Sequence, residues 1–153
     1  MPLRVLNRFL DDHDVKYVTI RHSPAFTSQQ IAASAHIPGK EIAKTVMVRI
    51  DGKLAMAVLP GSLKIDLDLL RDLAGAEVVE IAAEKEFSDL FPECETGAMP
   101  PFGILYDMEV YVSESLTEDE KIAFNGGSHS EVIQMDYRDF ENLVKPKFVI
   151  LSN

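Results

Sequence analysis

The chain has 153 residues and a formal net charge of −10, with 46% hydrophobic and 26% charged residues. This length and composition are typical of one globular domain, so we expect residues 1–153 to fold as a single unit. The acidic balance argues against a broad, non-specific nucleic-acid surface. Because no apolar run reaches about 18 residues and only one cysteine is present, we expect a cytoplasmic protein without a membrane partner.

Helical and strand-like patterns alternate through the first two thirds of the chain. Apolar residues at helical spacing, capping residues and period-two runs identify these elements. Asp51-Gly52 separates two β-rich runs and is the strongest hairpin signal in the sequence. The predicted elements are helices over 2–13, 28–36, 66–74 and 83–91, and strands over 16–20, 43–50, 53–59 and 77–81.

The last third of the chain is predicted to be mainly β. Asp136 is expected to cap a helix over 137–144. The expected strands are 104–106, 110–113, 122–125, 131–135 and 147–151. Hairpins mixed with short helices favour an α+β domain around one curved, mostly antiparallel sheet.

The side-chain patterns of common catalytic centres are missing from the sequence. The four histidines have no metal-ligand spacing, so we expect no metal and no cofactor. Ser128 and His129 are chain neighbours that would point to opposite faces of a strand, which makes them a poor nucleophile and base. Cys94 lies between Glu93 and Glu95, whose charges disfavour a reactive thiolate.

Three segments instead favour a site built from backbone. The first, here called the Gly/Pro loop, is Thr96-Gly97-Ala98-Met99-Pro100-Pro101-Phe102-Gly103, and the second is Phe124-Asn125-Gly126-Gly127-Ser128-His129. Glycine permits close approach of a ligand to the main chain, and proline stiffens the path. In the third segment, Ala43-Lys44-Thr45, a lysine begins an apolar strand and can meet an electronegative group. The three segments together favour a site for a small polar ligand.

These segments, in this order and together with Arg21-His22-Ser23-Pro24, resemble the YbaK/EbsC-type aminoacyl-tRNA deacylases. That family is related to the editing insertion domain of bacterial prolyl-tRNA synthetases, and the resemblance covers nearly the whole chain. It implies a mixed, partly barrel-like sheet surrounded by helices. It also implies hydrolysis in trans of the ester that joins a wrong amino acid to the 3′ end of a tRNA.

The resemblance further implies roles for individual residues. Lys44 would hold the substrate near its terminal nucleotide or ester. N–H groups along the Gly/Pro loop would bind the carbonyl or orient the attacking group, while Pro101 would fix the path of the loop. The implied catalytic residues are Lys44, Gly97, Ala98, Met99 and Pro101, and the implied substrate-binding residues are His22, Phe26, Phe102, Gly126, Gly127, Ser128 and His129.

Several alternatives stay open at this point. Ser128-His129 is similar to the segment of alanine and small-residue editors, but Pro100 stands where alanine editors have serine, so the amino acid is undefined. Water or a ribose hydroxyl could attack the ester. The oligomeric state is undefined, and the chain could act alone or docked on an aminoacyl-tRNA synthetase. The rival functions are a non-catalytic binding module for aminoacyl-tRNA or nucleotide, and a hydrolase of a small acylated molecule.

Overall fold

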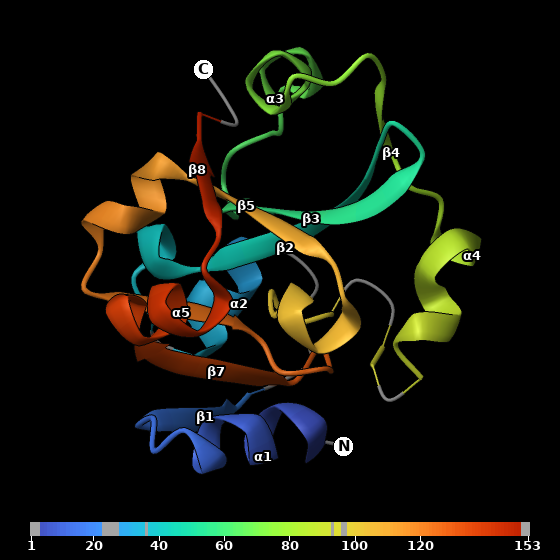
Figure 1. The fold of residues 1–153 in the computed structure, drawn as a ribbon. Helices are drawn as coiled ribbons and strands as arrows, with labels where there is room; N and C mark the ends of the chain where they lie inside the picture. Colours follow the sequence, from blue (N-terminus) through green and yellow to red (C-terminus); the bar gives the residue numbers. More distant parts are fainter. Residues whose placement is uncertain (1–3, 23–27, 36, 93, 96–97, 151–153) are drawn as a thin grey trace.

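The computed structural model describes residues 4–22, 28–35, 37–92, 94–95 and 98–150, which form an α+β fold (Figure 1). None of the helices in these ranges is long and apolar enough to cross a membrane. The α-helices are α1 (Arg4–Asp12), α2 (Ser28–Ala35), α3 (Leu67–Ala74), α4 (Glu84–Phe87) and α5 (Tyr137–Val144). The strands are β1 (Tyr17–Arg21), β2 (Ala43–Ile50), β3 (Lys53–Pro60), β4 (Val79–Ile81), β5 (Glu109–Ser113), β6 (Lys121–Asn125), β7 (Glu131–Asp136) and β8 (Lys147–Val149).

The strands form two sheets that meet at one point. A three-stranded antiparallel sheet has the order β1-β7-β6, and a five-stranded sheet has the order β4-β2-β3-β5-β8. The second sheet is mixed, because β5 runs parallel to both β3 and β8. A parallel bridge between Ile42 and Ala123 links the start of β2 to β6. The α+β class and the curved, mixed arrangement of strands are thus confirmed, although the strands form two sheets rather than the one expected and do not close into a barrel.

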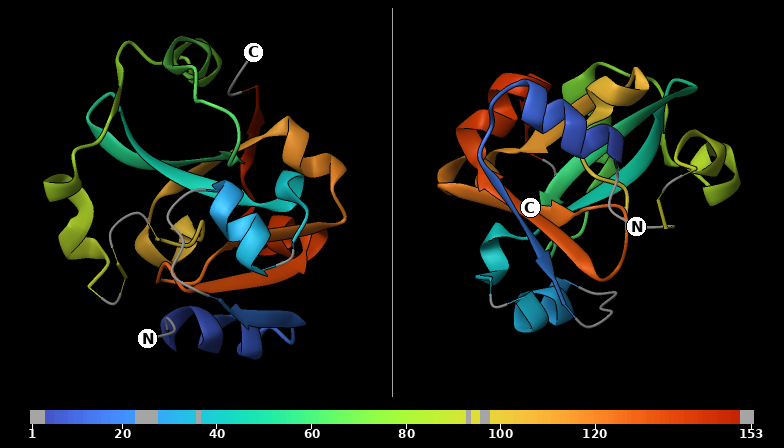
Figure 2. Two further views of the ribbon diagram at one scale, coloured as in Figure 1. Left: turned by 180° about the vertical axis from the view of Figure 1, so that it is seen from behind. Right: turned by 90° about the horizontal axis from the view of Figure 1, so that it is seen from below.

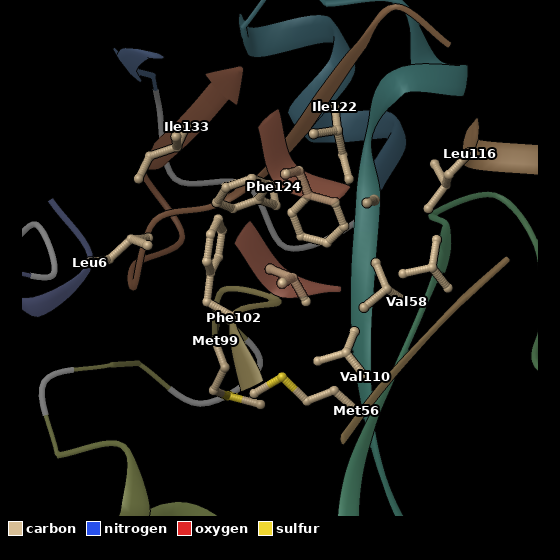
Figure 3. Close-up of a cluster of buried hydrophobic side chains, with 14 of the residues drawn as sticks. Leu6, Met56, Val58, Met99, Phe102, Val110, Leu116, Ile122, Phe124 and Ile133 are labelled. Carbon is tan, nitrogen blue, oxygen red and sulfur yellow. The ribbon is translucent and has the colours of Figure 1, made fainter. Parts of the chain in front are cut away.

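Three apolar clusters hold these layers together. The largest lies between the sheets and includes Phe102, Phe124 and Phe140, none more than 1% exposed, together with Leu6 of α1 (Figure 3). A second cluster joins the five-stranded sheet to α3 through Leu70. A third joins α2 to β6 and β7. Figures 1 and 2 accordingly show α3 over one sheet and α2 beside the other. Apolar residues therefore pack on both faces of each sheet, although the edge strands β1 and β4 are largely exposed.

Local signals in the sequence define several boundaries as predicted. Asp51 and Gly52 have φ values of 49° and 86°, the left-handed pair that a tight two-residue hairpin requires. The Asp51 carboxylate also accepts hydrogen bonds from the N–H groups of Glu77 and Val78, which holds the residues just before β4 beside the hairpin. Gly75, at φ 67°, ends α3 as its C-cap. The predicted hairpin and the predicted end of this helix are confirmed.

Other predicted elements were wrong or too long. Residues 103–106 form a 3₁₀ turn, η3 (Gly103–Tyr106), rather than a strand, because Met108 N–H bonds back to Gly103 C=O at 2.9 Å. The helix predicted over 83–91 is α4 followed by η2 (Ser88–Leu90). Two further 3₁₀ turns, η1 (Gly39–Glu41) and η4 (Glu114–Glu118), were not predicted. The Asp136 side chain makes no capping bond and lies 3.9 Å from Lys121 Nζ instead.

Gly103 allows the Gly/Pro loop to enter the fold, and its replacement by alanine tests this packing. A Cβ at this position would lie 2.5 Å from Met108 O and 2.6 Å from Val110 Cγ2. We expect Gly103→Ala to lower the free energy of unfolding by about 2–3 kcal/mol, measured by urea denaturation. Gly39→Ala is the matched control, since no atom lies within 4 Å of its Cβ, and it should change stability by less than about 0.5 kcal/mol. Equal effects of the two substitutions would contradict this packing.

Candidate functional site

The end of the β6–β7 hairpin provides one wall of the candidate site. Gly126 N–H donates to Glu131 C=O at 3.0 Å and closes the ladder, after which 127–130 reverse the chain. We call 126–130 the hairpin turn. Gly127 has a φ of 100°, a conformation that side-chain-bearing residues rarely adopt. The two consecutive glycines, both buried, therefore form a tight turn rather than a bulky loop.

The Gly/Pro loop is bonded directly to this hairpin turn. Glu95 N–H donates to Gly127 C=O at 2.8 Å, and Gly127 N–H donates to Ala98 C=O at 3.1 Å. A weaker contact joins His129 N–H to Glu95 Oε1 at 3.4 Å. Two of the three segments singled out in the sequence are thus held together by backbone hydrogen bonds, although some 30 residues separate them.

His22 and Ser128 lie at the same end of the three-stranded sheet. His22 N–H donates to Ser130 C=O at 2.9 Å and so continues the β1–β7 ladder by one residue. Ser128 is only 3% exposed, and its Oγ lies 3.4 Å from Ser130 Oγ. Ser128 and His129 belong to a turn and not to a strand, which corrects the strand geometry expected for them. The structure brings His22, the hairpin turn and Ala98 together.

Lys44 is the second residue of β2 and is half-buried. The bridge between Ile42 and Ala123 places this end of β2 beside β6, three residues before the hairpin turn begins at Gly126. Burial, and secondarily the charge of Lys64, lowers the pKa of Lys44. No carboxylate of the described residues lies within ion-pair distance of Lys44. A half-buried ammonium of this kind favours an incoming anion or oxygen ligand.

The remaining residues of the Gly/Pro loop lie largely in the core. Phe102 is fully buried, with its ring centroid 5.5 Å from those of Phe124 and Phe140. Met99, 6% exposed, packs in the same cluster near Phe102 (Figure 3), and Pro101 is buried. These side chains anchor the loop. Gly97 and Phe26, both expected at the site, lie outside the described residues.

The loop has fewer free backbone donors than its sequence suggests. Ala98 N–H is already bonded to Glu95 C=O at 3.0 Å, and the two prolines have no N–H. The N–H groups of Met99, Phe102 and Gly103 have no hydrogen-bond partner among the described residues. A backbone N–H of a buried residue is normally satisfied. Of these three donors, Met99 N–H follows directly on Ala98, which is bonded to the hairpin turn, and it is therefore the candidate donor to a ligand oxygen at that turn.

Sequence reasoning missed three polar residues around the hairpin turn. Glu95 bonds to the turn, as described above. Asn125 has a buried Oδ1 without a hydrogen-bond partner in the described part of the chain, and Glu131 is a buried carboxylate. A signal existed for Glu131, because it shares the strand parity of the inward-facing Ile133 and Met135. Asn125 belongs to a segment whose glycines, Ser128 and His129 were the residues expected at the site.

Comparison with known proteins identifies the family. A family model described as aminoacyl-tRNA editing domain matches residues 22–143. This range contains Lys44, the Gly/Pro loop and the hairpin turn. The chain belongs to the aminoacyl-tRNA editing domain family, and its resemblance to the YbaK-type proteins is confirmed at that level.

Individual relatives support the same assignment at moderate identity. The chain is 27% identical over 143 residues to the prolyl-tRNA editing protein ProX of Acetoanaerobium sticklandii, covering 89% of this chain and 86% of that protein. It is 25% identical over 88 residues to a proline–tRNA ligase of Bacillus mycoides. That second match covers 58% of the chain but spans only 15% of the ligase.

Solved structures share the fold. One, described as a candidate trans-editing enzyme for prolyl-tRNA synthetase, superposes with a TM-score of 0.83 at 18% identity, covering 98% of this chain and 96% of that one. A hypothetical protein superposes with a TM-score of 0.85 at 19% identity, covering 97% and 99% of the two chains. At these identities the likeness defines the architecture alone.

The electrostatic coupling at Lys44 leads to a testable prediction. Removing the charge of Lys64 takes away a repulsion that disfavours the charged Lys44, so Lys64→Gln should raise the pKa of Lys44. Side-chain ¹³C NMR titration of labelled lysine measures the shift. Lys85→Gln, which removes an exposed charge on α4, is the matched control and should leave the Lys44 titration unchanged. A Lys44 pKa that stays constant or falls in Lys64→Gln would contradict the coupling.

Proposed function

We propose that this chain hydrolyses, in trans, the ester bond of a mischarged aminoacyl-tRNA. The supporting observation is the hydrogen-bonded docking of the Gly/Pro loop on the hairpin turn, beside the end of β2 that carries Lys44. Membership of the editing-domain family supports the substrate class. The names of the relatives make a tRNA for proline that carries a wrong amino acid the first substrate to test.

In this proposal the reaction depends on positioning. A water oxygen adds to the ester carbonyl carbon, and the carbonyl oxygen gains negative charge. Where a ribose hydroxyl attacks first, the acyl group moves to that ribose oxygen, and water then hydrolyses the new ester by the same addition. The ester C–O bond then breaks, and the proton of the attacking group passes to the ribose oxygen that leaves. Hydrolysis yields the free amino acid and an uncharged tRNA. An activated ester needs accurate placement more than a strong nucleophile.

Each part of the site has a role in this scheme. Met99 N–H donates to the developing oxyanion, and Pro101 with Phe102 keeps the loop in place. Gly97 and Ala98 give the loop its close approach to the ligand. Lys44, left without a carboxylate partner in the described residues, holds the terminal nucleotide or ester oxygen.

The amino-acid side of the substrate faces the hairpin turn in this scheme. Gly126 and Gly127 leave space for a small side chain, and Ser128 and His129 bound that space. His22, bonded to Ser130, forms the neighbouring wall, and Phe26 completes it. A pocket of this kind separates amino acids that differ by one methyl group by only about 1–3 kcal/mol, so the edited amino acid has to be measured.

Substitution of Lys44 tests the proposal. The panel carries Ala, Ser, Thr, Cys or Pro on the tRNA for proline and on the cognate tRNAs, and wild-type protein should deacylate at least one member. Lys44→Ala should lower the kcat/KM for that member by about 100-fold or more. Lys53→Ala is the matched control, because Lys53 is an exposed lysine at the opposite end of the β2–β3 hairpin. It should retain activity within about twofold. Radiolabelled aminoacyl-tRNA supplies the readout.

Other outcomes of this panel separate the rival functions. Binding of aminoacyl-tRNA without turnover above the spontaneous rate would support the non-catalytic module. Turnover that does not change with salt would favour a small acylated substrate, since each phosphate contact to single-stranded RNA contributes a salt slope of about −0.7. Equal loss of activity in Lys44→Ala and Lys53→Ala would contradict the role given to Lys44.

A further inference from the structure

Glu131 is a buried residue whose carboxylate has one buried oxygen without a partner in the described part of the chain. The residue is 7% exposed, and its Oε2 has no hydrogen-bond partner in the described part of the chain. None of the ion pairs between described residues includes it. Burying an unpaired carboxylate is costly, and natural proteins retain such a group mainly where it has a function.

The neighbours of Glu131 leave this charge uncompensated. It is paired across the ladders with Gly126, which has no side chain, and with Arg21 of β1. Arg21 is exposed and makes no ion pair with Glu131. The next residue on the same face is the buried Ile133, whose Cγ1 would lie 3.2 Å from a Cβ at Gly126. Neither ladder neighbour therefore supplies a countercharge to the carboxylate.

Its position connects this carboxylate to the candidate site. Glu131 C=O accepts the N–H that closes the hairpin turn, so Glu131 lies at the base of the turn to which the Gly/Pro loop is bonded. The loop side chains that follow, Met99 and Phe102, pack in the same cluster as Ile133. The loop and the carboxylate therefore share the inner face of this hairpin end.

We propose that Glu131 binds the α-ammonium group of the aminoacyl ester, an assignment that rests on the proposed function. An aminoacyl ester carries this cation one carbon from the carbonyl, and its N–H groups match an acceptor that the protein leaves unused. A charge-assisted hydrogen bond formed only with substrate fixes the carbonyl relative to the loop. It also makes the enzyme selective for free over N-blocked aminoacyl groups.

The test compares the edited aminoacyl-tRNA with its N-acetylated form, which lacks the ammonium charge. Wild-type protein should hydrolyse the free form with a kcat/KM at least about tenfold higher. Glu131→Gln should lower hydrolysis of the free form by about 10-fold to 100-fold and leave that of the N-acetyl form unchanged, which removes the preference. Arg21→Gln, across the ladder, is the matched control and should keep the wild-type preference.

Thermal unfolding separates this role from a structural one. Because Glu131→Gln removes an uncompensated buried charge, the variant should melt at or above the wild-type temperature. A lower melting temperature in both Glu131→Gln and Arg21→Gln, with the substrate preference intact, would overturn the assignment in favour of a structural ion pair. Equal wild-type rates on both esters would overturn this assignment alone, whereas no hydrolysis of either would overturn the proposed function from which it follows.

Discussion

The candidate site depends on the two backbone hydrogen bonds of Gly127. Its C=O accepts from Glu95 and its N–H donates to Ala98, so one residue joins the hairpin turn to the Gly/Pro loop. The φ of 100° at this position is readily adopted by glycine and strained for other residues. A few residues further on, Phe102 enters the aromatic core with Phe124. The bonds of Gly127 therefore position the candidate site and also hold the loop whose Phe102 packs in the core.

The β2 end of the candidate site carries positive charge, whereas the chain as a whole is negatively charged. The protein carries a net charge of −10, yet Lys44 lies beside Lys64 without a carboxylate partner in the described residues. In the proposed function the positive charge meets the nucleotide end of the substrate, and the negative charge of Glu131 meets its amino group. Opposite charges on a polar substrate would then fix its direction in the site. The acidic remainder of the surface limits contact to the acceptor end of a tRNA.

Sequence gave reliable information where a local rule decides the conformation, as at Asp51-Gly52 and Gly75. It failed at 104–106, where the apolar run suggested a strand but the chain forms a 3₁₀ turn closed by the bond from Met108 N–H to Gly103 C=O. The segments of the site could be named from composition, but their docking could not, since it depends on backbone bonds between residues about 30 positions apart. Whether Glu131 has an ion-pair partner likewise depends on the residues that the fold places opposite it, which are Arg21 and Gly126.

The central claim is that the docked Gly/Pro loop and the hairpin turn form one ligand site next to Lys44. The most direct measurement is backbone amide NMR with an adenosine whose aminoacyl group is joined by a non-hydrolysable 3′-amide. The account predicts that the amides of Met99 and of the hairpin turn shift together, with the Lys44 side chain, at one dissociation constant. Shifts confined to another region, such as the α3 side of the five-stranded sheet, would contradict it.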